Sequence, residues 1–227
     1  LLSALPGCPV EPVPAQWGER IITALACDSR QVEPGALFFA LPGAKHDGRA
    51  FIGQALERGA AAIVVEAGGD GVKTLCDVPV PLYSAVNVRE VLALVSARFH
   101  GFPTRRLQSI AVTGTNGKTS VAWLTANALA GLGRNAALVG TLGMSCVPSG
   151  SCAAAPEMLK TINTTPDPLA VDSFLASAPH LQSLVMEVTS QGLVQCRTRG
   201  MEWDAAIFTN LTRDHLDYHK TLEAYAD

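Results

Sequence analysis

Short apolar segments alternate along the chain with longer segments of helical periodicity. Apolar runs at 36–41, 60–66, 80–84, 107–113, 136–141, 184–188 and 205–209 predict buried strands. Apolar positions spaced three and four apart predict helices at 51–59, 88–100, 118–132 and 169–178. In helix 118–132 the predicted inward face comprises Val121, Leu124, Ala128, Leu129 and Leu132, whereas residues 143–163 look irregular. The alternation predicts an α/β protein with mostly parallel strands.

A break after the helix at 88–100 divides the pattern. Gly101, Phe102 and Pro103 interrupt the chain there, which is typical of a boundary. We therefore expect a small α/β N-terminal domain over residues 1–103 and a central domain over residues 104–227. The sequence starts without Met and stops within a helical pattern, so we expect both domains to belong to a longer protein.

Composition narrows the possible functions. Charged residues make up 16% of the chain and the formal net charge is −3, so no basic field favours nucleic acid or an anionic membrane. The longest uncharged run, 135–156, is cut by Gly, Ser and Pro, which excludes a membrane span. The six cysteines lack zinc-site spacing. Cys146 and Cys152 could bridge, but we expect a reduced, cytoplasmic chain.

A glycine-rich loop joins the strand at 107–113 to the helix at 118–132. Backbone N–H groups of such a loop face phosphates, a lysine balances the β- and γ-phosphate charge, and a threonine hydroxyl can ligate Mg²⁺. The strict P-loop spacing is not met, because Val112 stands where its first glycine would be. The flanking strand and helix still favour a P-loop-type ATPase domain over a solvated turn. We assign ATP binding to Gly114, Thr115, Asn116, Gly117, Lys118, Thr119, Ser120 and Asn210.

Polar residues also follow other predicted strands. Glu187 ends the strand at 184–188, and Asp214, His215, Asp217 and His219 follow the strand at 205–209. Because the carboxyl ends of parallel strands meet at one edge, these groups could together hold Mg²⁺. Two alternatives stay open. Glu187 could be an exposed strand-end residue, and the Asp-His cluster could be a solvated turn or a zinc site lacking its fourth ligand.

Taken together, the motifs resemble the Mur ligases of peptidoglycan synthesis over nearly the whole chain. The resemblance rests on Asp28–Ser29–Arg30, the segments 34–38 and 47–49, the glycine loop, and the blocks at 163–166, 187–190, 195–197 and 209–219. Asn-Thr-Thr-Pro at 163–166 and Glu-Val-Thr-Ser at 187–190 favour the MurE branch. That branch adds the third peptide residue to UDP-N-acetylmuramoyl-L-alanyl-D-glutamate.

The resemblance implies a role for each matching residue. Contacts to the UDP part of the substrate are implied for Ser29, Ala44, Lys45, His46 and Asp47. Contacts to the muramoyl-dipeptide are implied for Asn163, Thr164, Thr165, Thr189, Gln195 and Arg197. The implied Mg²⁺ ligands are Thr119, Glu187 and His215, and the implied catalytic residues are Lys118, Glu187 and His215.

The implied reaction is ATP-dependent amide formation. ATP phosphorylates the D-glutamate side chain, and a diamino acid, expected to be meso-2,6-diaminopimelate, attacks the acyl phosphate. The implied partners are small molecules, namely ATP, the UDP-dipeptide and the diamino acid, and we expect a monomer. Alternatives are a MurF-like, lysine-adding or folylpolyglutamate-synthase-like ligase, or a non-catalytic nucleotide-binding module.

Two departures from the family pattern limit the carry-over. Thr189–Ser190–Gln191 stands where the family usually has Ser-Ser-His. Threonine keeps the hydroxyl, whereas Gln191 removes an imidazole and receives no role. The chain also ends before the carbamylated lysine and the C-terminal domain of the family, so we expect the segment alone to be inactive.

Overall fold

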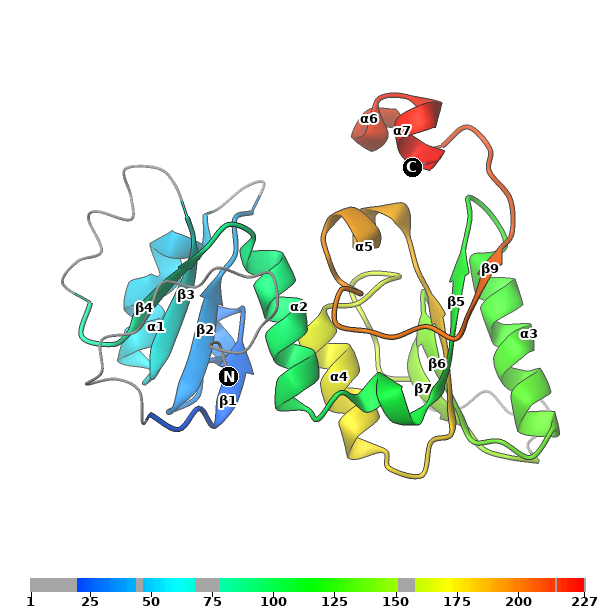
Figure 1. Ribbon diagram of the computed structural model, residues 1–227, viewed down its shortest axis with the longest axis horizontal. Coiled ribbons are helices and arrows are strands. Elements are labelled where there is room, and N and C mark those ends of the chain that lie inside the picture. Colours follow the sequence, from blue (N-terminus) through cyan, green and yellow to red (C-terminus); the bar gives the residue numbers. More distant parts are fainter. Residues whose placement is uncertain (1–19, 44–46, 68–77, 151–157, 215, 227) are drawn as a thin grey trace. The chain divides into compact units, whose positions relative to one another are not determined.

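The computed structural model describes residues 20–43, 47–67, 78–150, 158–214 and 216–226 (Figure 1). The chain forms two compact units, Leu1–Ser96 and Ala97–Asp227. The division falls inside helix α2 (Val88–Phe99), whereas the sequence pattern places it at residue 103. No helix among the described residues is long and apolar enough to cross a membrane.

The first unit is built on a four-stranded parallel sheet. Its strands, in the spatial order β1-β2-β3-β4, are β1 (Ala24–Ala26), β2 (Ala36–Ala40), β3 (Ala62–Glu66) and β4 (Leu82–Ala85). Every residue of β2 is buried, as expected for a parallel strand covered on both faces. Short helices connect the strands: η2 (Ser29–Gln31), η3 (Gly48–Phe51) and α1 (Ile52–Glu57).

The second unit contains a five-stranded sheet in the order β7-β6-β8-β5-β9. Its strands are β5 (Gln108–Thr113), β6 (Ala136–Gly140), β7 (Gly143–Val147), β8 (Ser183–Glu187) and β9 (Ala205–Phe208). All neighbours are parallel except β6 and β7, which form an antiparallel hairpin. The prediction that residues 143–163 are irregular is therefore wrong at its start, because β7 pairs with β6 as an edge strand.

Six short and long helices accompany this sheet in the described residues. They are η5 (Pro103–Arg106), α3 (Lys118–Gly131), α4 (Pro168–Ser177), α5 (Ser190–Val194), α6 (Leu216–His219) and α7 (Leu222–Ala226). In α3 the buried residues are Ala122, Ala126 and Ala130, while Leu124 and Leu132 are exposed. The predicted inward face is correct for Val121 and Leu129, which pack against the core cluster, and wrong for Leu124, Ala128 and Leu132, which are exposed. Small side chains let this helix approach the sheet closely, and alanines give a weak periodic signal.

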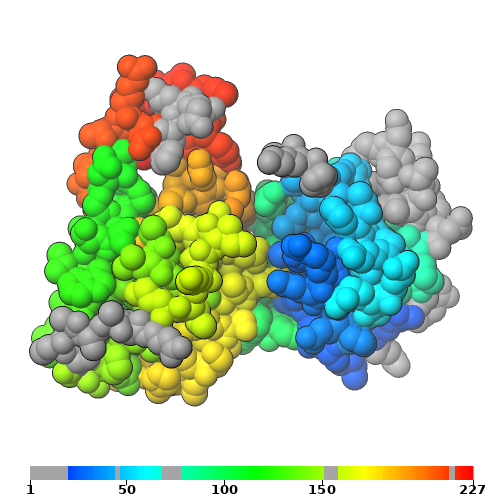
Figure 2. All heavy atoms as spheres, turned by 180° about the vertical axis from the view of Figure 1, so that it is seen from behind, coloured from blue at the N-terminus to red at the C-terminus, as the bar shows by residue number. Residues whose placement is uncertain are grey.

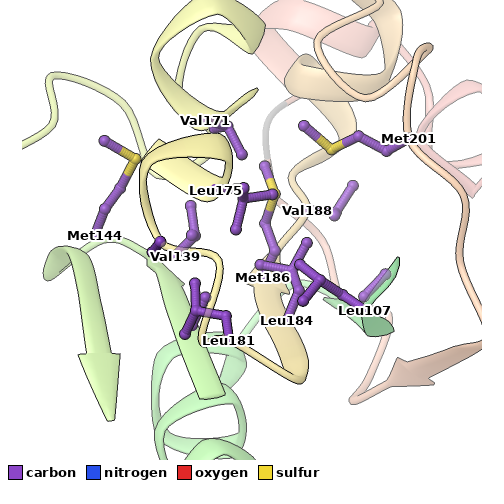
Figure 3. Close-up of a cluster of buried hydrophobic side chains, with 13 residues drawn as sticks. Leu107, Val139, Met144, Val171, Leu175, Leu181, Leu184, Met186, Val188 and Met201 are labelled. Atoms are coloured by element: carbon purple, nitrogen blue, oxygen red, sulfur yellow. The ribbon is translucent and has the colours of Figure 1, made fainter. Parts of the chain in front are cut away.

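The two faces of the sheet carry different helices. Leu184 and Met186 of β8 pack with Leu175 of α4, and Figure 3 shows this cluster of buried side chains. Val185, on the opposite face, packs in one cluster with Ala122 of α3. Because side chains alternate along a strand, Glu187 shares the face of Val185. The carboxylate of Glu187 therefore lies at the C-terminal end of the central strand β8, on the face of the sheet that α3 covers.

Candidate functional site

The loop between β5 and α3 has a backbone that requires glycine. Gly114 has φ +124° and Gly117, the N-cap of α3, has φ +84°, both in the region that other residues rarely adopt. A Cβ at Gly114 would lie 2.2 Å from Oγ1 of Thr209 and 2.8 Å from the carbonyl oxygen of Asn210. The loop therefore packs directly against the segment that follows β9, which leaves no space for a side chain.

Asn210 holds this loop through hydrogen bonds to its backbone. Its carbonyl oxygen accepts from the N–H of Thr115 at 2.8 Å, and its Oδ1 accepts from the N–H of Asn116 at 3.1 Å. Its Nδ2 donates to the carbonyl of Asn116 at 2.9 Å, and the Thr209 hydroxyl donates to that same carbonyl at 2.7 Å. Asn210, assigned to ATP binding from the sequence, thus lies against the loop and fixes its shape.

Lys118 folds back over the loop from the first turn of α3. Its Nζ donates to the carbonyls of Gly114 at 2.7 Å and Thr115 at 2.9 Å. The ammonium group is therefore held beside the glycine loop, with no acidic side chain among these contacts. Ser120, which was also assigned to ATP binding, is exposed on the same turn of α3. This places one positive charge at a helix N-terminus, an arrangement that favours an anion.

Glu187 is a buried carboxylate surrounded by donors. Its side chain is 2% exposed, which excludes the alternative of an exposed strand-end residue. Oε2 accepts from the Thr119 hydroxyl at 2.8 Å and from the Thr141 hydroxyl at 3.2 Å, and Oε1 accepts from the Thr141 N–H at 2.9 Å. A buried carboxylate needs such donors to offset its lost hydration. Thr119 and Glu187, two of the three implied Mg²⁺ ligands, are in direct contact.

Four of the predicted dipeptide-binding residues form a second cluster. Thr165 is 1% exposed, and its hydroxyl donates to the carbonyl of Glu187 at 3.1 Å. The hydroxyls of Thr165 and Thr189 share a hydrogen bond at 3.0 Å. Arg197 donates to the carbonyl of Thr165 at 2.5 Å and to Oε1 of Gln195 at 2.7 Å. The cluster thereby fixes the start of α5 beside the end of β8.

A pocket of about 620 Å³ opens beside these groups. The predicted residues that line it are Gly114, Thr115, Asn116, Gly117, Lys118, Thr119, Thr164, Glu187 and Thr189. Ser120, Asn163, Thr165, Gln195, Arg197 and Asn210 do not line it. His219 of the predicted Asp-His cluster also lines the pocket. Sequence reasoning missed other lining residues, among them Thr141, Ser190, Leu193, Phe208 and Tyr225. Gln191, which received no role, also lines the pocket.

The segment after β9 closes one side of this pocket. Nε2 of His219 and Oγ of Ser190 lie 2.8 Å apart in a hydrogen bond, and the hydroxyls of Tyr225 and Thr115 share one at 3.1 Å. Figure 2 shows the red C-terminal residues above the orange of α5. His215, a predicted Mg²⁺ ligand, lies outside the described residues. Among those that are described, no three His, Cys, Asp or Glu residues group as metal ligands.

The first unit contains a separate pocket of about 430 Å³. Ser29 lines it, and its hydroxyl donates to Oε1 of Gln54 at 2.6 Å. The neighbouring Asp28 pairs with Arg30 at 2.7 Å, and this hydrogen bond lowers the pKa of the Asp28 carboxyl. Asp47 caps η3 and does not line the pocket, and its bond to Arg49 lowers its pKa. The predicted residues Ala44, Lys45 and His46 lie outside the described residues.

Comparison with known proteins gives these observations a family. The sequence profile of the Mur ligase middle domain matches residues 112–227, which include the glycine loop and Glu187. The chain belongs to the Mur ligase family. A second profile, for the catalytic domain of the Mur ligase family, matches residues 21–100 and so covers the first unit of this family member.

Comparison with individual proteins shows which members of the Mur ligase family this chain resembles. It is 46% identical to the UDP-N-acetylmuramoyl-L-alanyl-D-glutamate–2,6-diaminopimelate ligase of Pseudomonas aeruginosa over 211 residues, covering 91% of this chain and 41% of that protein. A solved structure of a ligase with this same name matches at 31% identity with a TM-score of 0.76, covering 95% of this chain and 41% of the other. The fold is also shared with MurF from Thermotoga maritima in complex with ADP (21% identity, TM-score 0.58, 92% and 42% covered).

The chain spans 40–41% of the length of the Pseudomonas relatives with which it shares 46% identity. The solved ligase of the same name is likewise covered over 41% of its length.

Proposed function

We propose that this chain supplies the UDP-substrate domain and the ATP domain of a ligase that adds meso-2,6-diaminopimelate to UDP-N-acetylmuramoyl-L-alanyl-D-glutamate. The observation that carries the proposal is the contact between Thr119 and Glu187, whose oxygens lie 2.8 Å apart beside a glycine loop. The names of the relatives in Pseudomonas supply the substrate pair.

In this proposal the glycine loop and the N-terminus of α3 bind the phosphates of ATP. Lys118 is held at the loop by two carbonyl contacts, 2.7 and 2.9 Å long, which a phosphate oxygen can replace. The ammonium charge then faces the β- and γ-phosphates, where it neutralises the charge of the group being transferred. Tyr225 and Asn210 keep the loop in place through Thr115 and Asn116.

The residues beside the loop fit a magnesium ion. Mg²⁺ prefers oxygen ligands and is usually held by one or two carboxylates together with phosphate oxygens and water. The carboxylate of Glu187 and the hydroxyl of Thr119 are oxygen donors already in contact, and His215 is the third proposed ligand. When bound there, Mg²⁺ would offset negative charge on the nucleotide phosphates.

The substrate divides between the two units. We assign the UDP moiety to Ser29 and residues 44–47, and the muramoyl-dipeptide to Thr164 and Thr189, which line the larger pocket. Thr165, Gln195 and Arg197 support that second contact by fixing Thr189 and the start of α5. Asn163 is exposed, and its assignment rests on the family motif.

The proposed chemistry has two steps. A side-chain carboxylate oxygen of D-glutamate attacks the γ-phosphorus of ATP, the bond to ADP breaks, and an acyl phosphate forms. The neutral amine of diaminopimelate then attacks the acyl carbon, phosphate leaves, and the amine proton is lost. This chain contributes positioning and charge neutralisation, by Lys118 and the loop N–H groups, which are the main demands of phosphoryl transfer.

The test is substrate dependence of ADP release by the complete protein. We expect ADP only when ATP, Mg²⁺, the UDP-dipeptide and diaminopimelate are all present, with amide product in equal amount. Replacing diaminopimelate by L-lysine tests the choice of diamino acid within the same assay. Steady ADP release without either co-substrate would contradict the ligase, and nucleotide binding without any turnover would leave a non-catalytic binding module.

A substitution in the loop tests the phosphate site. Gly114→Ala is expected to weaken binding of ADP to the complete protein by at least about 10-fold, because its Cβ would meet Thr209 and Asn210 and its φ is +124°. Calorimetric titration measures the affinity. The matched control is Gly131→Ala in α3, where a Cβ meets no atom within 4 Å. Equal affinities for both variants would contradict a tight loop at the phosphates.

A further inference from the structure

We propose that Thr141 is a positioning residue of this site, which orients the carboxylate of Glu187 and joins the nucleotide side of the pocket to the substrate side. The inference rests on the proposed function and extends it to a residue that lacks an assigned role. Thr141 directly follows β6 and lines the larger pocket.

Two separate groups of Thr141 hold Glu187. The backbone N–H donates to Oε1 at 2.9 Å, and the hydroxyl donates to Oε2 at 3.2 Å. Together they donate hydrogen bonds to both carboxylate oxygens and so fix the rotation of the carboxylate plane. With that plane fixed, Oε2 faces the Thr119 hydroxyl at 2.8 Å. Loss of a residue that orients a metal-binding carboxylate in this way typically lowers metal affinity or activity by about 10- to 100-fold.

The glycine before Thr141 makes room for this arrangement. A Cβ at Gly140 would lie 2.1 Å from Oε1 of Glu187, and its three nearest atoms would all belong to that carboxylate side chain. The φ of Gly140 is not positive, so the nearest conflict is with the side chain of Glu187 and not with a strained backbone. The end of β6 is thus shaped around the carboxylate by a missing side chain and by two hydrogen bonds.

Thr141 also reaches the proposed dipeptide side. Its hydroxyl shares a hydrogen bond with the hydroxyl of Thr164 at 3.0 Å and accepts from that of Thr119 at 3.4 Å. Thr164 stands in the motif assigned to the muramoyl-dipeptide, and Thr119 stands at the phosphate loop. The exposed hydroxyl of Thr141 therefore contacts a residue assigned to the dipeptide, a residue of the phosphate loop, and Glu187. Removal of this hydroxyl should affect the site more than the fold.

Thr141→Val in the complete protein tests the inference, because valine keeps the shape and the backbone N–H but loses the hydroxyl. Calorimetry measures the affinity for ADP with Mg²⁺ and with EDTA. We expect the dissociation constant with Mg²⁺ to rise by roughly 10-fold, and the value in EDTA to stay unchanged. Thr141→Ser should restore the affinity to within about threefold, because the hydroxyl returns.

Thr161→Val is the matched control, since its hydroxyl donates to the carbonyl of Gly140 at 3.4 Å. Wild-type affinity is expected for it under both conditions. An unchanged Mg²⁺-dependent affinity in Thr141→Val, or an equal loss in EDTA, would overturn the inference, as would a serine variant as impaired as the valine one. If the ADP affinity of the wild-type protein were the same with Mg²⁺ and with EDTA, that result would overturn the proposed function, and the inference with it.

Discussion

Lys118→Ala in the complete protein is expected to lower kcat for ADP release by roughly 10³-fold. The ammonium group lies 2.7 Å from the carbonyl of Gly114 and 2.9 Å from that of Thr115, so it is already at the loop before a nucleotide arrives. Its removal takes away the positive charge that would face the transferring phosphoryl group. An enzyme-coupled assay of ADP release at saturating substrate concentrations measures kcat.

The control for this variant is Lys160→Ala, which removes an exposed lysine outside the pocket lining. Its turnover should match wild type within about twofold, as is usual for exposed positions without special contacts. Lys118→Arg keeps the charge but replaces a compact ammonium by a larger planar group, and we expect little recovery. Wild-type turnover in Lys118→Ala would remove this lysine from the phosphate site.

The parts of the fold that were predicted correctly depend on local signals. The strand–glycine–lysine sequence specifies β5, the loop and the start of α3, because the turn needs glycine at Gly114 and Gly117 whatever surrounds it. Strands β2, β3 and β8 each contain an unbroken apolar run, at 36–40, 62–65 and 184–186, as parallel strands covered on both faces require. Each of these signals lies within about ten residues.

The errors and omissions concern contacts between distant segments. β7 exists because it pairs with β6, and its own sequence, Gly143–Val147, carries little strand signal. The buried face of α3 is made of alanines, so the larger Leu124 and Leu132 suggested the wrong side. The hydrogen bond between His219 and Ser190 spans 29 positions. The two motifs were expected at the same edge of the sheet, but nothing in either of them predicts this contact.

Thr141 occupies the same kind of position as Glu187. Both residues stand at the carboxyl end of a parallel strand, β6 and β8, and those strands are neighbours in the sheet. A carboxylate at the end of an apolar strand is unusual and so marks Glu187 as a candidate, whereas a threonine at such a position is common and does not mark Thr141. Only the register between β6 and β8 shows that the two side chains meet.

Glu187→Gln should lower kcat by roughly 10²- to 10³-fold and largely remove the effect of Mg²⁺ on ADP affinity. The change preserves shape but removes the charge. The thermal midpoint should fall by only a few degrees, because the glutamine oxygen can accept from the Thr141 N–H while its NH₂ faces the hydroxyls of Thr119 and Thr141. Hydroxyl groups can rotate to accept, so few polar atoms lose their partners.

The matched control is Glu202→Gln, at a carboxylate that is 61% exposed and pairs with Arg105 at 2.8 Å on the surface. Such pairs contribute about 0–1 kcal/mol, so stability and turnover should both stay close to wild type. The two variants make the same chemical change and differ in burial and neighbours. If Glu187→Gln behaved like Glu202→Gln, the buried carboxylate would serve packing alone and the magnesium assignment would fail. A fall in the thermal midpoint beyond ten degrees with unchanged Mg²⁺ dependence would lead to the same conclusion, because the loss would then come from the fold and not from the ion.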